Sequence, residues 1–330
     1  MLKNQKINYR QNSYNTSDSG IMVGLALVIP QFLMIAITLI CSSATGLPFS
    51  SVDPNVKTFV DTYPTLYTVL CGIVPQVGML ISFFFLSERK KIHYAKANQI
   101  HLKNFNWIVM LIVLAIGVVC LFGFTPFVNW FDHIVEGWGY TSSTANIDVG
   151  TVGKFIGAVF YIGLLPAIVE ELVFRGVITN GIKEKGIKTA VLFSAILFAV
   201  MHQNLQQFVY QLFLGGVMAY IVLKTGNILY TMLLHFFNNF VVLLDSHLNG
   251  GKTPKIDYGN AWNNIYPFLL VILTVAVVIG LLFLLNFVLK KQKTKQSNSQ
   301  LEVQQAKNNK QSIGKQKNQI ETTNRDLTLQ

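Results

Sequence analysis

Pro166-Ala-Ile-Val-Glu-Glu-Leu-Val-Phe-Arg-Gly176 places two acids and one base inside a long apolar segment. Two further polar runs, Phe198-Ala-Val-Met-His202 and His235-Phe-Phe-Asn-Asn239, lie in or at the end of later apolar segments. Hydrocarbon disfavours ionisable side chains, so those found at membrane depth usually face a cavity and serve a function. We therefore expect the rest of the chain to be organised around residues 166–239.

The composition around this stretch is that of a membrane protein. The chain has 330 residues, of which 52% are hydrophobic and only 12% charged, too apolar for an ordinary soluble protein. The apolar residues come in blocks of roughly 20, the length of a bilayer-spanning helix. We predict an all-α polytopic membrane protein with about eight transmembrane helices. The predicted segments are approximately residues 21–42, 66–87, 105–125, 152–178, 189–202, 208–223, 228–244 and 262–289.

The positive charge is placed in a way that predicts orientation. The net charge is +11, and residues 290–330 alone contain nine Lys or Arg against three Asp or Glu, a net +6. Basic loops follow the second, fourth, sixth and eighth segments, and neutral or acidic loops alternate with them. Because cytoplasmic loops carry the excess of Lys and Arg, both termini are expected in the cytoplasm, where the basic segments could touch anionic lipid. An aromatic and basic platform for nucleic acid is missing from the sequence, which argues against that partner.

These segments divide the chain into five parts. Residues 1–20 are expected to form a cytoplasmic N-terminal tail, and residues 21–149 the first three helices with an extracytoplasmic loop. Residues 150–250 form a core of helices four to seven. Residues 251–289 comprise a loop and the eighth helix, and residues 290–330 a basic, disordered cytoplasmic tail.

Two stretches leave alternatives open. In residues 127–150, aromatic and aliphatic residues recur at helical spacing, which indicates either a short helix along the membrane surface or an ordinary connecting loop. The fifth segment, at about 14 residues, would reach only about 21 Å of a bilayer core of about 30 Å. Either it starts earlier, or the Gln-rich break after His202 lies within the membrane. Polar backbone at that depth must be buried in protein or line a wet cavity, so the second option fits a site near His202.

The two neighbouring glutamates are expected to behave differently. Glu171 and Arg175 are four residues apart with the acid first, the favourable order for an ion pair on one helix face. Glu170 points about 100° away and has no such partner in its own helix, so it is available as a general base. The alternative is that both acids are structural. Pro166, four residues before Glu170, predicts a kink beside the site, although membrane bundles also tolerate proline.

The other polar residues gain meaning as a set. His202 closes Phe198-x-x-x-His, and His235 shares a helix face with Asn239, with Asn238 as the fallback partner. Each alone could be a satisfied polar residue or a link between helices. Together, a carboxylate, two imidazoles and a carboxamide from three segments can polarise a water and stabilise a tetrahedral oxyanion. That set suits peptide-bond hydrolysis without a Ser or Cys nucleophile.

These motifs resemble those of a known family. Glu-Glu-x-x-x-Arg at 170–175, Phe-x-x-x-His at 198–202 and His-x-x-x-Asn at 235–239 are similar to the motifs of the CPBP (Abi) family. Its members are intramembrane proteases related to the CAAX prenyl endopeptidases and to bacteriocin-processing and self-immunity proteins. The resemblance covers about residues 150–250.

The resemblance implies a role for each matching residue. It implies that Glu170 activates water together with His202, and that His235 and Asn239 form the oxyanion pocket. Glu171 and Arg175 would brace the site, with Phe198 and Asn238 in support.

The resemblance also leaves the question of a metal open. Glu170, His202 and His235 could make a zinc site with two histidines and one glutamate. The zinc signature His-Glu-x-x-His is absent from the sequence, so a mechanism without metal or other cofactor is preferred.

The leading hypothesis is an intramembrane endopeptidase acting on a membrane-bound peptide or protein from the cytoplasmic side of the bilayer. The alternatives are a non-enzymatic membrane scaffold or bacteriocin self-immunity protein, and a transporter that uses the buried acids and histidines as a relay. The Asn-, Lys- and Gln-rich composition suggests an AT-rich bacterial genome and hence a bacterial plasma membrane. Processing of a peptide pheromone or bacteriocin is then a more natural role than prenyl-CAAX cleavage.

Overall fold

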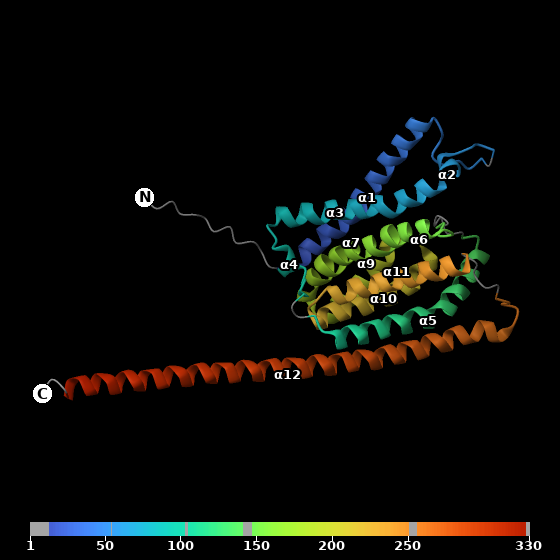
Figure 1. Cartoon of the computed structure of the whole chain (residues 1–330). Coiled ribbons are helices and arrows are strands. Elements are labelled where there is room, and N and C mark those ends of the chain that lie inside the picture. Colours follow the sequence, from blue (N-terminus) through green and yellow to red (C-terminus); the bar gives the residue numbers. More distant parts are fainter. Residues whose placement is uncertain (1–12, 54, 103–104, 141–146, 251–255, 328–330) are drawn as a thin grey trace, which may run out of the picture. The chain divides into compact units, whose positions relative to one another are not determined.

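The computed structural model of the chain describes residues 13–53, 55–102, 105–140, 147–250 and 256–327 (Figure 1). All of the regular secondary structure in these residues is helical, which confirms the all-α prediction. The chain divides into two compact units, Met1–Leu281 and Leu282–Gln330. Everything that bears on the candidate site lies in the first unit.

Each of the eight predicted segments coincides with a helix or a run of helices. Six of these runs are long and apolar enough to cross a membrane by length and composition, which makes this a multi-pass membrane protein. The other two are α9, which is short, and α11; a total of eight spans and the position of the termini stay predictions. The eight runs are α1 (Thr16–Thr45), α3 (Pro64–Arg89), α5 (Trp107–Gly137), Val152–Lys185, α9 (Ile187–Met201), α10 (Leu205–Thr225), α11 (Leu229–Asn249) and α12 (Ala261–Leu327).

The third helix is longer than its predicted segment. α5 continues through Pro126 to Gly137, so the predicted separate surface helix or loop is wrong for residues 127–137. The extension has a packing partner in the first turns of α12. The ring of Trp130 contacts Phe268 at a centroid distance of 4.7 Å, and its indole N–H donates to Asn264 Oδ1 at 3.1 Å. Residues 141–146 of the predicted loop lie outside the described residues.

Both terminal tails also differ from their predictions. α1 begins at Thr16, inside the predicted tail, because Asn15 and Asp18 cap it reciprocally, each side chain accepting from the other's backbone N–H. Residues 1–12 lie outside the described residues. The prediction of disorder beyond Lys290 is wrong as far as Leu327, since α12 continues to that residue. The segment is rich in Gln and Lys and lacks proline, a composition with good helix propensity.

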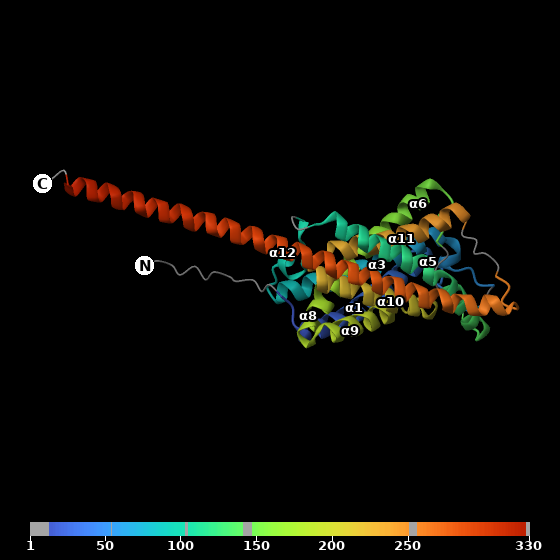
Figure 2. The same cartoon turned by 90° about the horizontal axis from the view of Figure 1, so that it is seen from below.

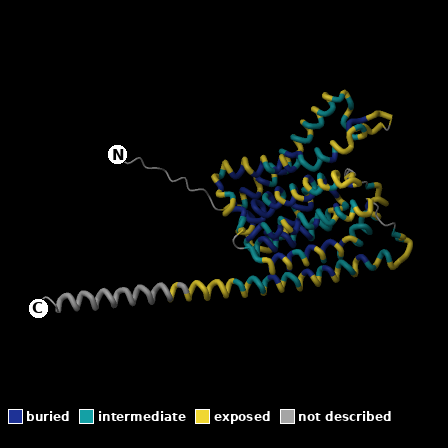
Figure 3. Tube along the Cα trace, in the orientation of Figure 1, coloured by how far each residue is buried: buried dark blue, intermediate teal, exposed yellow. Residues whose placement is uncertain are grey.

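The helices of the first unit pack around α7 (Leu165–Glu171), which contacts α3 and α11 (Figures 1 and 2). α5 packs on α10 and α11, and α9 pairs with α10 as an antiparallel hairpin. Figure 3 shows buried residues concentrated in the helices around α7, whereas the second half of α1 is largely exposed. Exposed apolar residues such as Phe32 and Leu39 are what a lipid-facing helix requires.

Contacts between loops bring the predicted cytoplasmic connections to one end of this unit. Asp18 at the start of α1 pairs with Lys90 after α3, with Oδ1 and Nζ 2.8 Å apart. Thr16 bonds Glu184, which lies between Lys183 and Lys185. The structure therefore places the start of α1 beside the basic turns at Lys90 and at Lys183–Lys185, while the orientation of the chain in the membrane stays a prediction.

The run Val152–Lys185 is not a regular α-helix. It contains two π-helical stretches, η2 (Val159–Leu164) and η3 (Leu172–Thr179), separated by the seven residues of α7. Pro166 lies in the first turn of α7, at the predicted irregularity. π-Helical turns are rare and occur often at functional sites, and here they flank the two neighbouring glutamates.

Candidate active site

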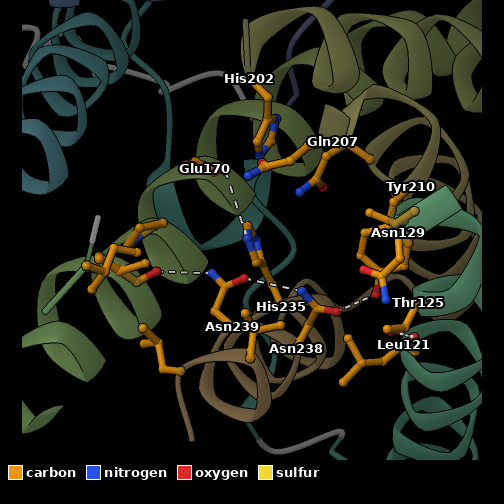
Figure 4. A pocket seen from close by; sticks show the side chains of 17 residues that line it. Leu121, Thr125, Asn129, Glu170, His202, Gln207, Tyr210, His235, Asn238 and Asn239 are labelled. Carbon is orange, nitrogen blue, oxygen red and sulfur yellow. Dashed lines mark hydrogen bonds and ion pairs between the residues drawn. The ribbon is translucent and has the colours of Figure 1, made fainter. Parts of the chain in front are cut away.

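All four residues predicted to be catalytic face one cavity (Figure 4). The cavity has a volume of about 420 Å³ and lies between α5, α7, α10 and α11. Figure 4 shows Glu170, His202 and His235 on one side and Thr125, Asn129 and Tyr210 on the other. The residues that line it are Leu121, Thr125, Val128, Asn129, Ile147, Ile162, Pro166, Glu170, His202, Gln207, Tyr210, Gln211, His235, Asn238, Asn239, Val242 and Leu243.

Glu170 has partners on two other helices. Its Oε1 accepts a hydrogen bond from Nε2 of Gln76 on α3 at 2.9 Å. Its Oε2 lies 4.0 Å from Nε2 of His235 on α11. The side chain is 12% exposed, so the carboxylate is largely shielded but reaches the cavity. The expectation that Glu170 has no ion-pair partner within its own helix agrees with these contacts.

Glu171 belongs to a separate, fully buried group. Its Oε1 lies 3.1 Å from Nη1 of Arg175, the ion pair predicted from the spacing, and 3.2 Å from Nδ1 of His235. Arg175 also donates from Nη2 to the Gly215 carbonyl at 3.3 Å, and its guanidinium lies 4.3 Å from the ring centroid of Phe198. Glu171 therefore holds one nitrogen of His235, while the other nitrogen faces Glu170.

His202 lies where α9 ends, so this short helix places the His202 side chain at the cavity. Its Nδ1 lies 2.7 Å from the Phe198 carbonyl oxygen, and its ring packs edge-on against the Phe198 ring at 4.7 Å. The helix starts only two residues earlier than predicted, at Ile187, and ends at Met201. Gln203 takes a positive φ of 49°, and α10 begins at Leu205. The break beside the cavity is thus shorter than the predicted Gln-rich stretch, and Gln207 lines the cavity from α10.

Asn239 is anchored by the irregular helix opposite. Its Nδ2 donates to the carbonyl of Ile162 at 3.1 Å. Ile162 lies four residues before Pro166, which has no N–H to offer that carbonyl in an α-helical pattern. Asn239 Oδ1 accepts from Asn238 Nδ2 at 3.3 Å, and Asn238 Oδ1 accepts from the Tyr210 hydroxyl. The anchor uses one Nδ2 hydrogen of Asn239 and leaves the second for another acceptor.

Several polar residues around the site were not predicted from the sequence. One is Gln76, a carboxamide in the middle of an apolar segment, and that position alone could have marked it. Thr125 and Asn129 on α5 and Gln207 and Gln211 on α10 are each four residues apart, so helical spacing could have indicated two polar stripes. They lie outside the three motifs and were missed for that reason.

The candidate zinc ligands do not fit a metal ion as they are placed. Among the residues that the structure describes, no group of three or more His, Cys, Asp or Glu could hold a metal. Two ligands that each lie about 2.0–2.2 Å from a tetrahedral zinc ion are roughly 3.4 Å apart, whereas Oε2 of Glu170 and Nε2 of His235 are 4.0 Å apart.

Comparison with known proteins agrees with this geometry. Residues 152–241 match the family model described as type II CAAX prenyl endopeptidase Rce1-like. The matched part runs from the start of α6 (Val152–Ala158) into α11 and contains all three motifs. Neither a curated protein nor a solved structure matches the chain. Residues 152–241 are therefore similar to the Rce1-like type II CAAX endopeptidases of the CPBP family, which are membrane-embedded proteases.

Proposed function

We propose that the chain is an intramembrane endopeptidase that hydrolyses a peptide bond in a membrane-associated peptide or protein, with water activated by Glu170. The observation that carries the proposal is the single cavity shared by Glu170, His202, His235 and Asn239. A non-enzymatic scaffold has no need to bring these four side chains together in a hollow.

The contacts of Glu170 suggest which oxygen reacts. Gln76 occupies Oε1, so Oε2, which faces His235, is the oxygen that accepts a proton from water. The water oxygen attacks the carbonyl carbon of the scissile bond, and His202 on the same side of the cavity helps to hold the water. The carbonyl oxygen becomes an oxyanion. As the intermediate collapses, the C–N bond breaks, and the proton on Glu170 passes to the leaving amine.

His235 and Asn239 are suited to stabilise that oxyanion. Glu171 accepts from Nδ1 of His235, which turns Nε2 toward Glu170 and the cavity, where Nε2 can donate when it carries a proton. Asn239 offers the Nδ2 hydrogen that Ile162 does not use. Arg175 neutralises Glu171, so the group that holds His235 carries no net negative charge toward the cavity. Donors fixed in advance in a dry site are an effective source of transition-state stabilisation.

The lining of the cavity supports a neutral substrate segment. Of the residues described around it, Glu170 is the only Asp, Glu, Lys or Arg. The others are apolar residues, carboxamides such as Asn129, the two histidines, and the hydroxyl-bearing Thr125 and Tyr210. A free terminal carboxylate would find no Lys or Arg among these lining residues. We therefore assign cleavage to an internal bond with uncharged residues on both sides. A peptide pheromone or bacteriocin precursor in a bacterial plasma membrane meets this description, as do other apolar membrane peptides.

The decisive experiment replaces Glu170 by its isosteric amide. Purified full-length Glu170→Gln in vesicles should cleave a membrane-bound reporter peptide about 10²- to 10⁴-fold more slowly, because a general base is lost. Its thermal unfolding should match that of the parent. Glu136→Gln, an exposed acid at the end of α5, is the matched control and should keep full activity.

The same variant separates the enzyme from the binding alternatives. Unchanged cleavage by Glu170→Gln would refute the proposal. Full protection of cells by this variant in a bacteriocin challenge would favour a self-immunity role, and ion flux sensitive to Glu170 in vesicles would favour transport.

A further inference from the structure

We infer that Gln76 is a positioning residue for Glu170, so that the working unit of the protein includes α3, outside the region 152–241 that matches the family. The inference rests on the proposed role of Glu170 as the general base. It gives α3, which contains none of the three motifs, a role in positioning the proposed general base.

The first observation is that Gln76, a polar residue, is buried at a position where an apolar side chain would lose less free energy on burial. Gln76 is only 6% exposed, and its Nε2 donates to Oε1 of Glu170 at 2.9 Å. Its own Oε1 is buried without a hydrogen-bond partner among the described residues. Burying an unsatisfied amide oxygen is unfavourable. The carboxamide is thus poorly suited to holding helices together for stability alone, and its one hydrogen bond is directed at the proposed base.

The second observation is that α3 is shaped to approach the site closely. Gly72 lies one helical turn before Gln76, on the same face of α3. A Cβ at Gly72 would lie 2.5 Å from Cδ2 of Tyr161 and 3.2 Å from the Tyr161 carbonyl oxygen. Because ring and backbone both stand in the way, only glycine allows this approach. The close contact of α3 with η2 carries Gln76 within reach of Glu170.

These contacts define what Gln76 does. A carboxylate can rotate about its last bond and present either oxygen to the cavity. The Gln76 N–H captures Oε1 and leaves Oε2 facing His235 and the space where water and substrate meet. Without it, the carboxylate samples other orientations, and the reactive one is populated less often. Gln76 does not line the cavity, so substrate binding should not depend on it.

The test measures kcat and KM separately for full-length variants in vesicles with the reporter peptide. Gln76→Leu should lower kcat about 10- to 100-fold, the scale of a lost hydrogen bond to a charged group, and leave KM within about twofold. Gly72→Ala should lower kcat in the same way by a smaller factor. Ser82→Ala is the control, because Ser82 is fully buried on the same helix and its hydroxyl donates to the Gly78 carbonyl of that helix at 2.8 Å; its kcat should not change.

The outcomes separate this inference from the proposed function. If Glu170→Gln abolishes cleavage and Gln76→Leu keeps the parental kcat, the positioning role is refuted and the proposed function stands. If Glu170→Gln cleaves at the parental rate, the proposed function is refuted, and the positioning role of Gln76 is refuted with it. If Gln76→Leu unfolds at a lower temperature than the parent, Gln76→Met is measured in its place, because methionine resembles glutamine in length and flexibility. A parental kcat in that folded variant overturns the inference, and a reduced kcat with unchanged KM supports it.

Discussion

Residues 152–241 contain every side chain to which the family resemblance assigns a role, whereas residues 13–151 contain none, yet both regions build the same cavity. From the earlier region, α3 brings Gln76 to Glu170, and α5 brings Thr125 and Asn129 to the opposite wall. The motif-bearing region supplies groups that can move protons. The earlier region supplies neutral groups that orient and enclose them. A family motif therefore marks the chemistry of this protein, while part of the site geometry comes from helices without a motif.

The largest effect should come from breaking the buried ion pair of the motif-bearing region. Arg175→Met leaves Glu171 fully buried without its cation, which should destabilise the protein by about 3–5 kcal/mol. Thermal unfolding in detergent measures the change. Lys188→Met removes an exposed cation nearby and should have almost no effect. An unchanged Tm for Arg175→Met would show that Glu171 does not depend on Arg175.

The next largest effect should be on catalysis. Asn239→Leu removes the proposed oxyanion donor, so kcat should fall about 10²- to 10³-fold. Asn238→Leu removes one contact of Asn239 but keeps its side chain and its bond to the Ile162 carbonyl, so it should cost much less. If Asn239 served only to hold the Ile162 carbonyl, its loss would lower the unfolding temperature without this fall in kcat.

A smaller effect is expected from the wall that the earlier region builds. Asn129→Leu removes a neutral hydrogen-bonding group from the cavity without touching Glu170 or His235. One neutral hydrogen bond contributes about 0.5–1.5 kcal/mol, so KM for a substrate that uses it should rise about 2- to 10-fold while kcat stays the same. Steady-state kinetics with two reporter peptides, one polar and one apolar beside the scissile bond, measures the change. Equal KM values for parent and variant with both peptides would remove Asn129 from substrate binding.

The smallest effect should be at the exposed edge of the matched region. A hydrogen bond from the Lys154 ammonium holds the pKa of Asp148 below its ordinary value. A lowered pKa stabilises the folded state above the ordinary carboxylate pKa, and this stabilisation is lost as the pH falls through the folded value. Both side chains are exposed, so solvent and salt screen the pair. Asp148→Asn should leave the unfolding temperature unchanged at pH 7 and at pH 3, and a clear drop at pH 7 alone would contradict this.

Local patterns in the sequence predicted the features that depend on local physics. Apolar blocks located the helices, and the spacing of Glu171 and Arg175 predicted their ion pair, since both follow from the geometry of a single helix. The gathering of Glu170, His202, His235 and Asn239 followed from what such groups need at membrane depth.

Features that depend on contacts between distant segments could not be predicted in this way. Gln76 contacts Glu170 because Gly72 allows α3 to approach η2 closely. The sequence around Gln76 contains no pattern that indicates this contact. α5 extends past Pro126 onto α12, where Trp130 meets Phe268. The π-helical turns carry no distinctive residue pattern, because apolar side chains suit them and regular turns alike.

Those wide turns have a consequence for how this chain can vary. A hydrogen bond that spans five residues rather than four accommodates extra chain within a continuous helix. Removing one residue between Leu172 and Thr179 would let the stretch rewind as an ordinary α-helix, and side chains within it would then point in new directions. Arg175 would then no longer lie on the side of the helix where it pairs with Glu171 and bonds the Gly215 carbonyl of α10. This stretch should tolerate exchanges of one apolar residue for another far more readily than any change in its length.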